Sequence, residues 1–168
     1  NDSYYGMNPP ALGVRIVQSP IVSTNNPFDT AFLPYDTLIG FKLTQMSGFN
    51  GFINGSNECF GEPDNAVNAF EYLRGRWGCG NPIINWVTNQ ETTFRFSGNA
   101  CTRSGWYDST TGDKRTFSNM GPLTLQSGDT QIIVLSYIIT RDGGNNFQNV
   151  CAVQSLSDSA LKYYYNDF

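Results

Sequence analysis

The sequence offers fourteen carboxylates and four cysteines but no histidine among its 168 residues, which limits the chemistry its side chains can perform. Without an imidazole base, Ser–His–Asp and Cys–His nucleophiles are excluded. A glycosidase needs only two carboxylates that flank the bond to be cleaved. The glutamates here are scattered among turns and one helix face, where solvated surface groups are the simpler interpretation. We therefore expect no catalytic site and no enzyme activity.

The cysteines are the next candidates for chemistry. None forms a C-x-x-C pair, and no histidine could complete a zinc site. An even number in a polar, loop-rich chain predicts two disulfide bonds in an oxidising compartment. The spacing leaves all three pairings open. The alternative is four buried free thiols in a cytosolic protein. The residues concerned are Cys59, Cys79, Cys101 and Cys151.

Oxygen ligands for calcium occur together in the segment 108–113, where Asp108 and Asp113 are candidate ligands. The spacing differs from that of an EF-hand loop and the bidentate glutamate is missing, so a hydrogen-bonded turn is the simpler interpretation. We expect no other metal and no cofactor.

Aromatic side chains in loop-like sequence could form a platform for sugar rings. Trp86, Trp106 and Tyr107 are the candidates to face a ligand. The alternative is that they close the edge of the core, because large aromatic side chains are mostly buried.

The charge pattern excludes two classes of partner. Only 14% of the residues are charged, the net charge is −4, and the lysines and arginines are dispersed. A stripe that neutralises phosphates and a basic amphipathic helix are therefore both missing, so we expect neither nucleic acid binding nor membrane-surface binding. The longest apolar run, residues 132–139, is too short to span a bilayer. Asn, Gly, Ser and Thr supply the polar surface, as in many secreted β proteins.

Frequent Gly and Pro residues predict a mainly β protein, an antiparallel β-sandwich with two helices. Residues 132–139 are apolar on both faces, which predicts a central strand covered on two sides. Helical spacing of apolar residues predicts a short mid-chain helix at about 64–76 and a C-terminal helix at about 150–165. The expected strands are residues 11–17, 39–44, 49–53, 92–96, 114–118 and 130–140.

Length favours a single domain over residues 1–168. The chain starts at Asn1 without a charged and apolar leader, so we expect a fragment or mature module of a longer exported protein.

Several motifs resemble an uncharacterised β-rich segment of large exported proteins of Bacteroidota, which commonly carry a sorting domain for type IX secretion. The resemblance covers nearly the whole chain, although Cys79 and Cys101 depart from the usual pattern. It implies export and a place at the cell surface, and it carries over no catalytic residue. The motifs are residues 8–13 (NPPALG), 46–49 (MSGF), 68–77 (NAFEYLRGRW), 94–99 (FRFSGN), 104–106 (SGW), 112–115 (GDKR) and 121–129 (GPLTLQSGD).

A second resemblance concerns modification. Four tripeptides begin with Asp followed by a hydroxyl residue, a pattern similar to the O-glycosylation acceptors of Bacteroidota. It implies a glycoprotein, and the candidate acceptors are Thr30, Thr37, Ser109 and Ser159.

Together these features favour a non-catalytic module of a secreted or cell-surface bacterial protein, serving adhesion, assembly or spacing. Its partners would be neighbouring domains of the same polypeptide, other copies of itself or surface glycans. Two alternatives are a carbohydrate-binding accessory domain of an exported hydrolase and a subunit of an extracellular filament. In the filament, the tail at 163–168 would contact a neighbouring copy.

Overall fold

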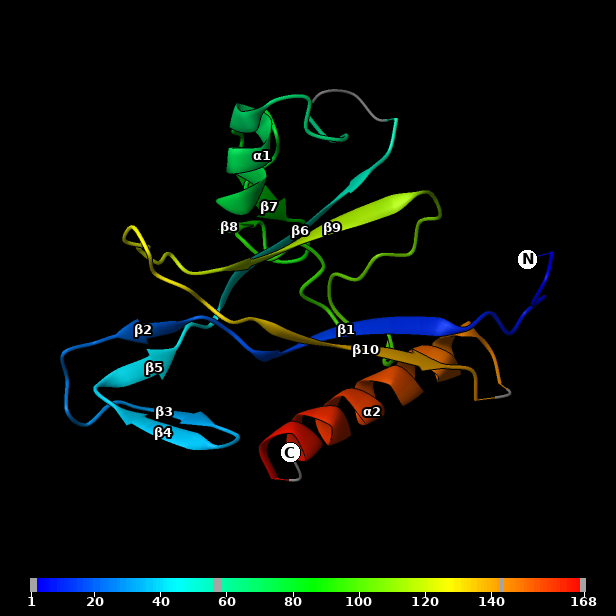
Figure 1. The fold of residues 1–168 in the computed structure, drawn as a ribbon. Coiled ribbons are helices and arrows are strands. Elements are labelled where there is room, and N and C mark those ends of the chain that lie inside the picture. Colours follow the sequence, from blue (N-terminus) through cyan, green and yellow to red (C-terminus); the bar gives the residue numbers. More distant parts are fainter. Residues whose placement is uncertain (1–2, 56–58, 143, 167–168) are drawn as a thin grey trace. The chain divides into compact units, whose positions relative to one another are not determined.

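A computed structural model describes residues 3–55, 59–142 and 144–166 and confirms a mainly β, antiparallel fold with a mid-chain and a C-terminal helix (Figure 1). Contacts divide the chain into two compact units, unit 1 (residues 1–44 and 123–168) and unit 2 (residues 45–122). The elements are β1 (Ala11–Gln18), β2 (Ile21–Ser23), β3 (Thr30–Leu33), β4 (Asp36–Ile39), β5 (Phe41–Leu43), β6 (Met46–Ile53), α1 (Ala66–Leu73), β7 (Ile83–Asn85), β8 (Gln90–Thr92), β9 (Lys114–Met120), β10 (Val134–Thr140) and α2 (Asn146–Asn166).

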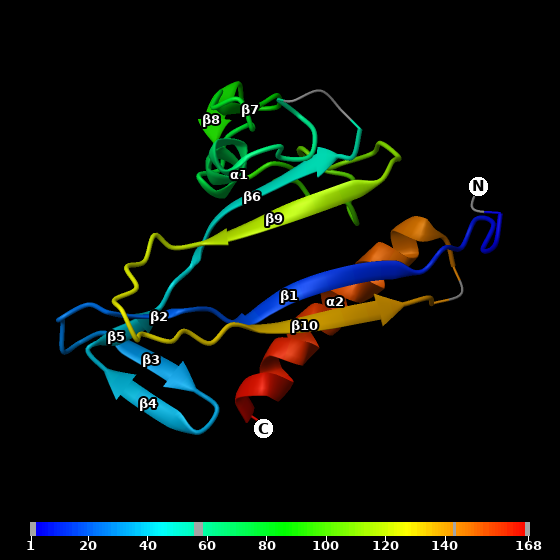
Figure 2. The same ribbon diagram turned by 45° about the horizontal axis from the view of Figure 1, so that its top comes forward.

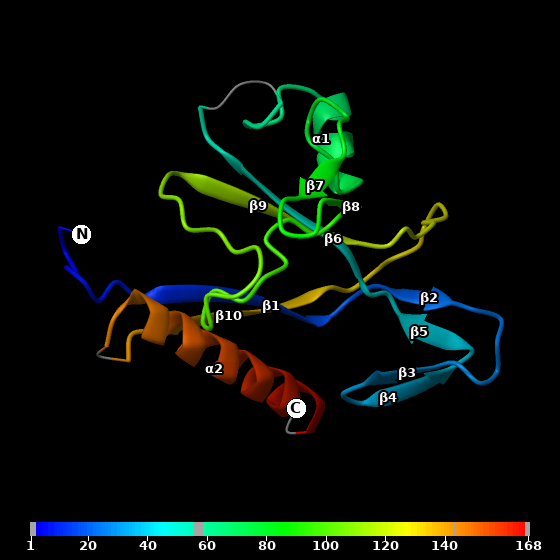
Figure 3. The ribbon, with the colours of Figure 1, turned by 180° about the vertical axis from the view of Figure 1, so that it is seen from behind.

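The main feature of unit 1 is the antiparallel ladder of β1 and β10, with α2 packed along it (Figures 1 and 3). Successive side chains of a strand point to opposite faces, so each strand divides its residues between two surfaces. Val17 and Ile138 lie on the face toward α2 and are buried. Gly13 permits the close approach of the helix, because a Cβ there would lie 2.3 Å from Cγ1 of Val153.

Helix α2 begins four residues before the predicted start. The Asn145 side chain accepts hydrogen bonds from the backbone N–H groups of Phe147 (3.0 Å) and Gln148 (3.1 Å), which is the role of an N-cap. At the other end, Tyr164 donates to the Gln18 side chain at 2.6 Å and Tyr165 to the Val17 carbonyl at 3.1 Å. These bonds fasten the end of the helix to β1.

Two short ladders complete unit 1. Strand β2 pairs with β5, and β3 pairs with β4 across a tight turn. Ala31 of β3 is buried, whereas Phe32 and Ile39 lie on the opposite, exposed face of this hairpin.

Unit 2 is built on the ladder of β6 and β9, which Figure 2 shows as its longest strand pair. Its first and last strands pair with each other, so the unit begins and ends at the same place, with Met46 opposite Met120. Helix α1 packs on β9, and the hairpin of β7 and β8 follows it. The buried apolar core of the unit consists of Phe52, Tyr72, Ile83 and Trp106.

Helix α1 is shorter than predicted at both ends. Its N-cap is Asn65, whose side chain accepts hydrogen bonds from the backbone N–H groups of Val67 and Asn68. It ends at Leu73 because Gly75 takes a positive φ of 72°.

Two strand predictions were wrong in detail. Residues 132–139 do not form a central strand, because β10 starts at Val134 and pairs with β1 alone among the described residues. Tyr137 and Ile139 of β10 are 67% and 71% exposed. The expected strand 92–96 is replaced by β8, which ends at Thr92. Phe94 continues only as an isolated bridge to Phe49.

Candidate functional site

The aromatic platform predicted for sugar binding is not formed as a set. Trp106 is buried and packs edge-on against Phe96 with ring centroids 5.5 Å apart, as the core-edge alternative predicts. Tyr107 is half-buried beside it. Trp86 is 69% exposed near the tip of the β7–β8 hairpin, where the Asn85 side chain accepts hydrogen bonds from the turn. The carbohydrate alternative therefore depends on Trp86 among the three predicted residues.

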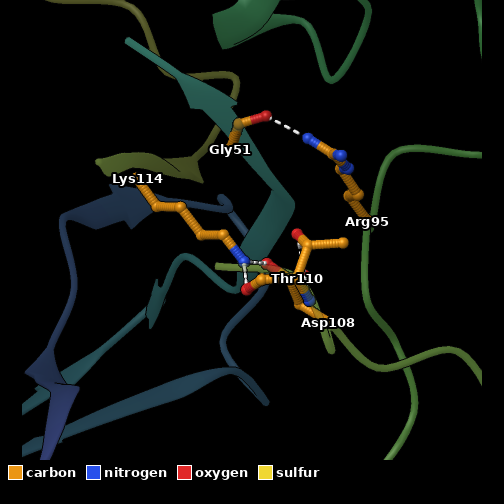
Figure 4. Close-up of polar contacts among 5 residues, drawn as sticks. All are labelled: Gly51, Arg95, Asp108, Thr110 and Lys114. Atoms are coloured by element: carbon orange, nitrogen blue, oxygen red, sulfur yellow. Dashed lines mark hydrogen bonds and ion pairs between the residues drawn. The ribbon is translucent and has the colours of Figure 1, made fainter. Parts of the chain in front are cut away.

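Asp108 forms the centre of a polar network that ties the loop after Trp106 to β9 (Figure 4). Its carboxylate accepts from Lys114 Nζ at 2.5 Å and from the N–H and hydroxyl of Thr110 at 3.0 and 2.8 Å. Lys114 also donates to the Thr110 carbonyl. Burial acts to raise the pKa of Asp108, but these hydrogen bonds and the charge of Lys114 outweigh it and hold the pKa below its ordinary value.

Both predicted calcium ligands, Asp108 and Asp113, are ion-paired with protein cations. Asp108 is bound to an ammonium group, and Asp113 lies 3.6 Å from Arg115 and accepts from Asn54 at 3.0 Å. Within residues 3–55, 59–142 and 144–166, three or more metal-ligating side chains nowhere gather. The two carboxylates therefore act as partners of protein cations in this structure.

The depressed pKa makes a testable statement about acid stability. A carboxylate whose pKa is lowered by folding stabilises the fold above its unfolded pKa of about 3.9, and this stabilisation is lost as pH falls through the folded value. Asp108→Asn should therefore lower the free energy of unfolding by about 1 kcal/mol at neutral pH. The gap to the wild type should close as pH falls from about 5 to about 2 in urea titrations. A gap that stays constant over this range would contradict the role given to the Asp108–Lys114 pair.

Arg95 was not singled out by the sequence, yet it holds the centre of unit 2. Its guanidinium lies 4.7 Å from the Trp77 ring centroid and 4.4 Å from that of Phe96, and it donates to the Gly51 carbonyl (Figure 4). Burial lowers the pKa of Arg95, partly offset by the charge of Asp108. An arginine stacked between rings and bonded to backbone connects β6 with the loop after β8, which is a structural role.

All four cysteines are oxidised, as predicted. Cys59 pairs with Cys79, joining the segment before α1 to the turn after it, and Cys101 and Cys151 are disulfide-bonded as well. Disulfide bonds of this kind are typical of proteins that work in oxidising, extracellular compartments.

The candidate O-glycosylation residues differ in exposure. Thr37, Ser109 and Ser159 are exposed, while Thr30 is half-buried. Thr30 and Thr37 share the outer face of the β3–β4 hairpin, where each lies opposite an apolar residue, Ile39 and Phe32 respectively. Whether any of them is modified stays a prediction.

The face of the β1–β10 ladder opposite α2 has no role assigned so far. Cross-strand pairs on this face are apolar throughout: Leu12 with Ile139, Val14 with Tyr137, and Ile16 with Leu135. All are exposed except Ile16, which is half-buried. We call these six residues the outer ladder face.

A separate groove lies at the end of this ladder next to α2, since Tyr164 of α2 is among its lining residues. The groove has a volume of about 570 Å³ and is also lined by Gln18 of β1, by Ile132 before β10, and by Tyr35 and Phe41 from the short ladders of unit 1. Tyr35 and Ile132 are exposed. The groove and the outer ladder face both belong to unit 1.

No protein-family model, curated protein or solved structure matches the chain. Among the described helices, none combines the length and the hydrophobicity needed to cross a bilayer.

Proposed function

We propose that the protein is a non-catalytic assembly module of a secreted or surface-attached bacterial protein, and that the outer ladder face binds a second copy of the chain. The observation that carries the proposal is the row of exposed cross-strand apolar pairs of β1 and β10. Exposed apolar patches of this extent mark interaction sites on soluble proteins.

The composition of the face favours a second copy over an unlike partner. It carries no charged side chain, so two copies can meet face to face without like-charge repulsion. A two-fold axis brings the same patch of each copy into contact, the commonest arrangement of homo-oligomers. The only polar side-chain atom of the outer ladder face is the Tyr137 hydroxyl. It lies at the far end of the aromatic ring, where it can stay in contact with water.

The ladder itself is also incomplete as an isolated element. A two-stranded sheet alone is marginally stable in water and needs further packing, for example against a helix. Helix α2 covers one face of β1–β10, and within unit 1 no described element covers the other. Association would bury it. A stable interface needs about 800 Å² from each partner. The outer ladder face is only about 17 Å long and two strands wide, so surface residues around it would have to contribute as well.

The extracellular setting of the proposal is supported by the disulfide bonds and by the resemblance to exported Bacteroidota segments. The proposal also includes surface attachment after type IX secretion, a role in adhesion and the absence of enzyme activity. The filament alternative has less support: Tyr164 and Tyr165 are held by β1, and Tyr163 is the exposed ring of the three. Residues 167–168 of the predicted tail contact lie outside the described residues.

Light scattering after size exclusion tests the assembly. The wild type is expected to form dimers at micromolar concentration, and Ile139→Asp should raise the dimer dissociation constant at least about 100-fold, because a carboxylate would be buried without a partner. Val67→Asp is the matched control, since Val67 is similarly exposed but lies on α1 in unit 2.

Far-UV circular dichroism of both variants checks that the fold is retained. A wild type that is monomeric at high concentration, or an Ile139→Asp variant that associates as well as Val67→Asp, would refute the second copy as occupant. Association lost equally in both variants would have the same consequence.

A further inference from the structure

Unit 2 contains a polar pocket that none of the preceding roles uses. Its volume is about 540 Å³, within the range of small-molecule sites. The side chains that give it chemical character come from the turn after α1 and from the end of the β7–β8 hairpin. They are Arg74, Arg76, Glu91, Thr92 and Thr93.

The two arginines differ in how their charges are balanced. Arg74 lies 3.1 Å from Glu71 and 5.7 Å from the Phe70 ring centroid, so its charge is already paired. Arg76 is half-buried, and its side chain donates to the Gly80 carbonyl at 3.0 Å. Within the described part of the chain Arg76 has no carboxylate within ion-pair distance. Its remaining N–H groups are therefore available to an anion, and guanidinium binds a carboxylate through two parallel hydrogen bonds.

Glu91 determines which kind of anion fits. It lines the same pocket, is exposed, and its side chain forms no hydrogen bond or ion pair with the described residues. A bare inorganic anion would be repelled by this carboxylate. A ligand that carries both a carboxylate and hydroxyl groups satisfies both side chains, since Glu91 can accept hydrogen bonds from hydroxyls.

The position of Arg76 is fixed before any ligand arrives. Its carbonyl accepts from the buried Asn50 side chain at 2.8 Å, and it forms a bridge to Pro82. Gly75, next to it, allows Thr93 to lie close, because a Cβ there would be 2.6 Å from the Thr93 Cβ. A prearranged cation lowers the ordering cost of binding.

We infer that this pocket binds an acidic sugar, a uronic acid residue of a glycan, with its carboxylate on Arg76 and its hydroxyls on Glu91. The pocket lies in unit 2 and the outer ladder face in unit 1, so the inference is independent of the proposed assembly.

Isothermal titration of the full chain with digalacturonate tests the inference, with uncharged maltose as the matched ligand. The wild type should bind digalacturonate and not maltose. Arg76→Gln should weaken binding about tenfold or more, as expected when a charge-assisted pair of hydrogen bonds is lost. Arg115→Gln is the control, because Arg115 pairs with Glu62 and Asp113 away from the pocket and its loss should leave the affinity unchanged.

Glu91→Gln separates a sugar site from a simple anion site. Because Glu91 is exposed, the variant should fold normally, and its affinity for digalacturonate should fall about threefold as a charge-assisted acceptor becomes a neutral one. No binding by the wild type, equal binding of maltose, or an affinity unchanged in Arg76→Gln would overturn the inference. An affinity raised in Glu91→Gln would overturn the assignment to a sugar. These results would leave the dimerisation experiment untouched.

Discussion

Replacing Tyr72 by alanine is expected to lower the free energy of unfolding by about 4 kcal/mol, the largest effect of any single change proposed here. The ring is fully buried and packs against two others, 5.5 Å from the centroid of Phe52 and 5.4 Å from that of Phe117, the latter stacked. Removing it leaves a cavity between α1 and the β6–β9 ladder that the surrounding strands cannot fill. Urea denaturation followed by Trp fluorescence would measure the loss.

Tyr72→Phe divides that effect into packing and hydrogen bonding. The hydroxyl donates to the Gly61 carbonyl at 2.8 Å, with the Cys59 carbonyl 3.1 Å away, which ties α1 to the disulfide-bonded segment before it. Phenylalanine keeps the ring, so the cost should be about 1.5 kcal/mol. Equal destabilisation by phenylalanine and alanine would show that the ring packing contributes little, contrary to the structure.

Tyr72 also shows what helical spacing in the sequence can and cannot predict. The spacing placed Val67, Phe70, Tyr72 and Leu73 on a helix, and the helix exists. Yet Tyr72 is buried while Val67, Phe70 and Leu73 are 67%, 59% and 53% exposed. Periodicity indicates that a segment is a helix, but the partner that covers one of its faces comes from strands distant in the sequence.

The apolar run at 132–139 was misread for a similar reason. A strand that is apolar on both faces is usually covered on both, and this rule predicts a central strand. Here α2 covers one face, while the outer ladder face stays exposed. An apolar strand face in a sequence indicates that other residues should pack on it, but not whether those residues belong to the same chain. For this reason, an exposed apolar row of this kind points to assembly.

The pocket residues gave no local signal at all. Arg76 and Glu91 lie in separate segments, and only the β7–β8 hairpin and the bridge between Arg76 and Pro82 bring them together. The disulfide bonds, by contrast, followed from the count of cysteines. Their pairing did not, because spacing alone cannot place Cys59 beside Cys79.

The buried asparagines are the other feature that sequence could not reveal, since asparagine is abundant in the exposed loops of this chain. Asn149 of α2 is fully buried. Its Nδ2 donates to the Asn8 side chain and the Pro9 carbonyl, both at 2.7 Å, and its Oδ1 accepts from the Asp142 N–H at 2.7 Å. This one amide holds the entry to β1 and the exit from β10 against the helix.

Asn149→Ala is therefore expected to cost about 3 kcal/mol, because it leaves buried backbone groups without partners. Asn149→Asp is the sharper change: it keeps the shape but places a carboxylate against the acceptor oxygens of Asn8 and Pro9. Burial and these acceptors should raise the pKa of the new carboxyl. The loss of stability should therefore be greatest at neutral pH, where the carboxyl is charged. Part of the stability should return as pH falls, because the protonated carboxyl can donate a hydrogen bond. Urea denaturation at several pH values would measure this recovery relative to the wild type.

Asn146→Asp is the matched control for this experiment. Asn146 is exposed in the first turn of α2, where a negative charge is favourable to the helix dipole, so the variant should be as stable as the wild type. A loss in Asn149→Asp that is no larger than in Asn146→Asp, or that does not diminish in acid, would mean that the Asn149 hydrogen bonds do not hold unit 1 together. The opposite result would show that α2, β1 and β10 are joined through a polar group as much as through the apolar contacts of Val17, Ile138 and Val153.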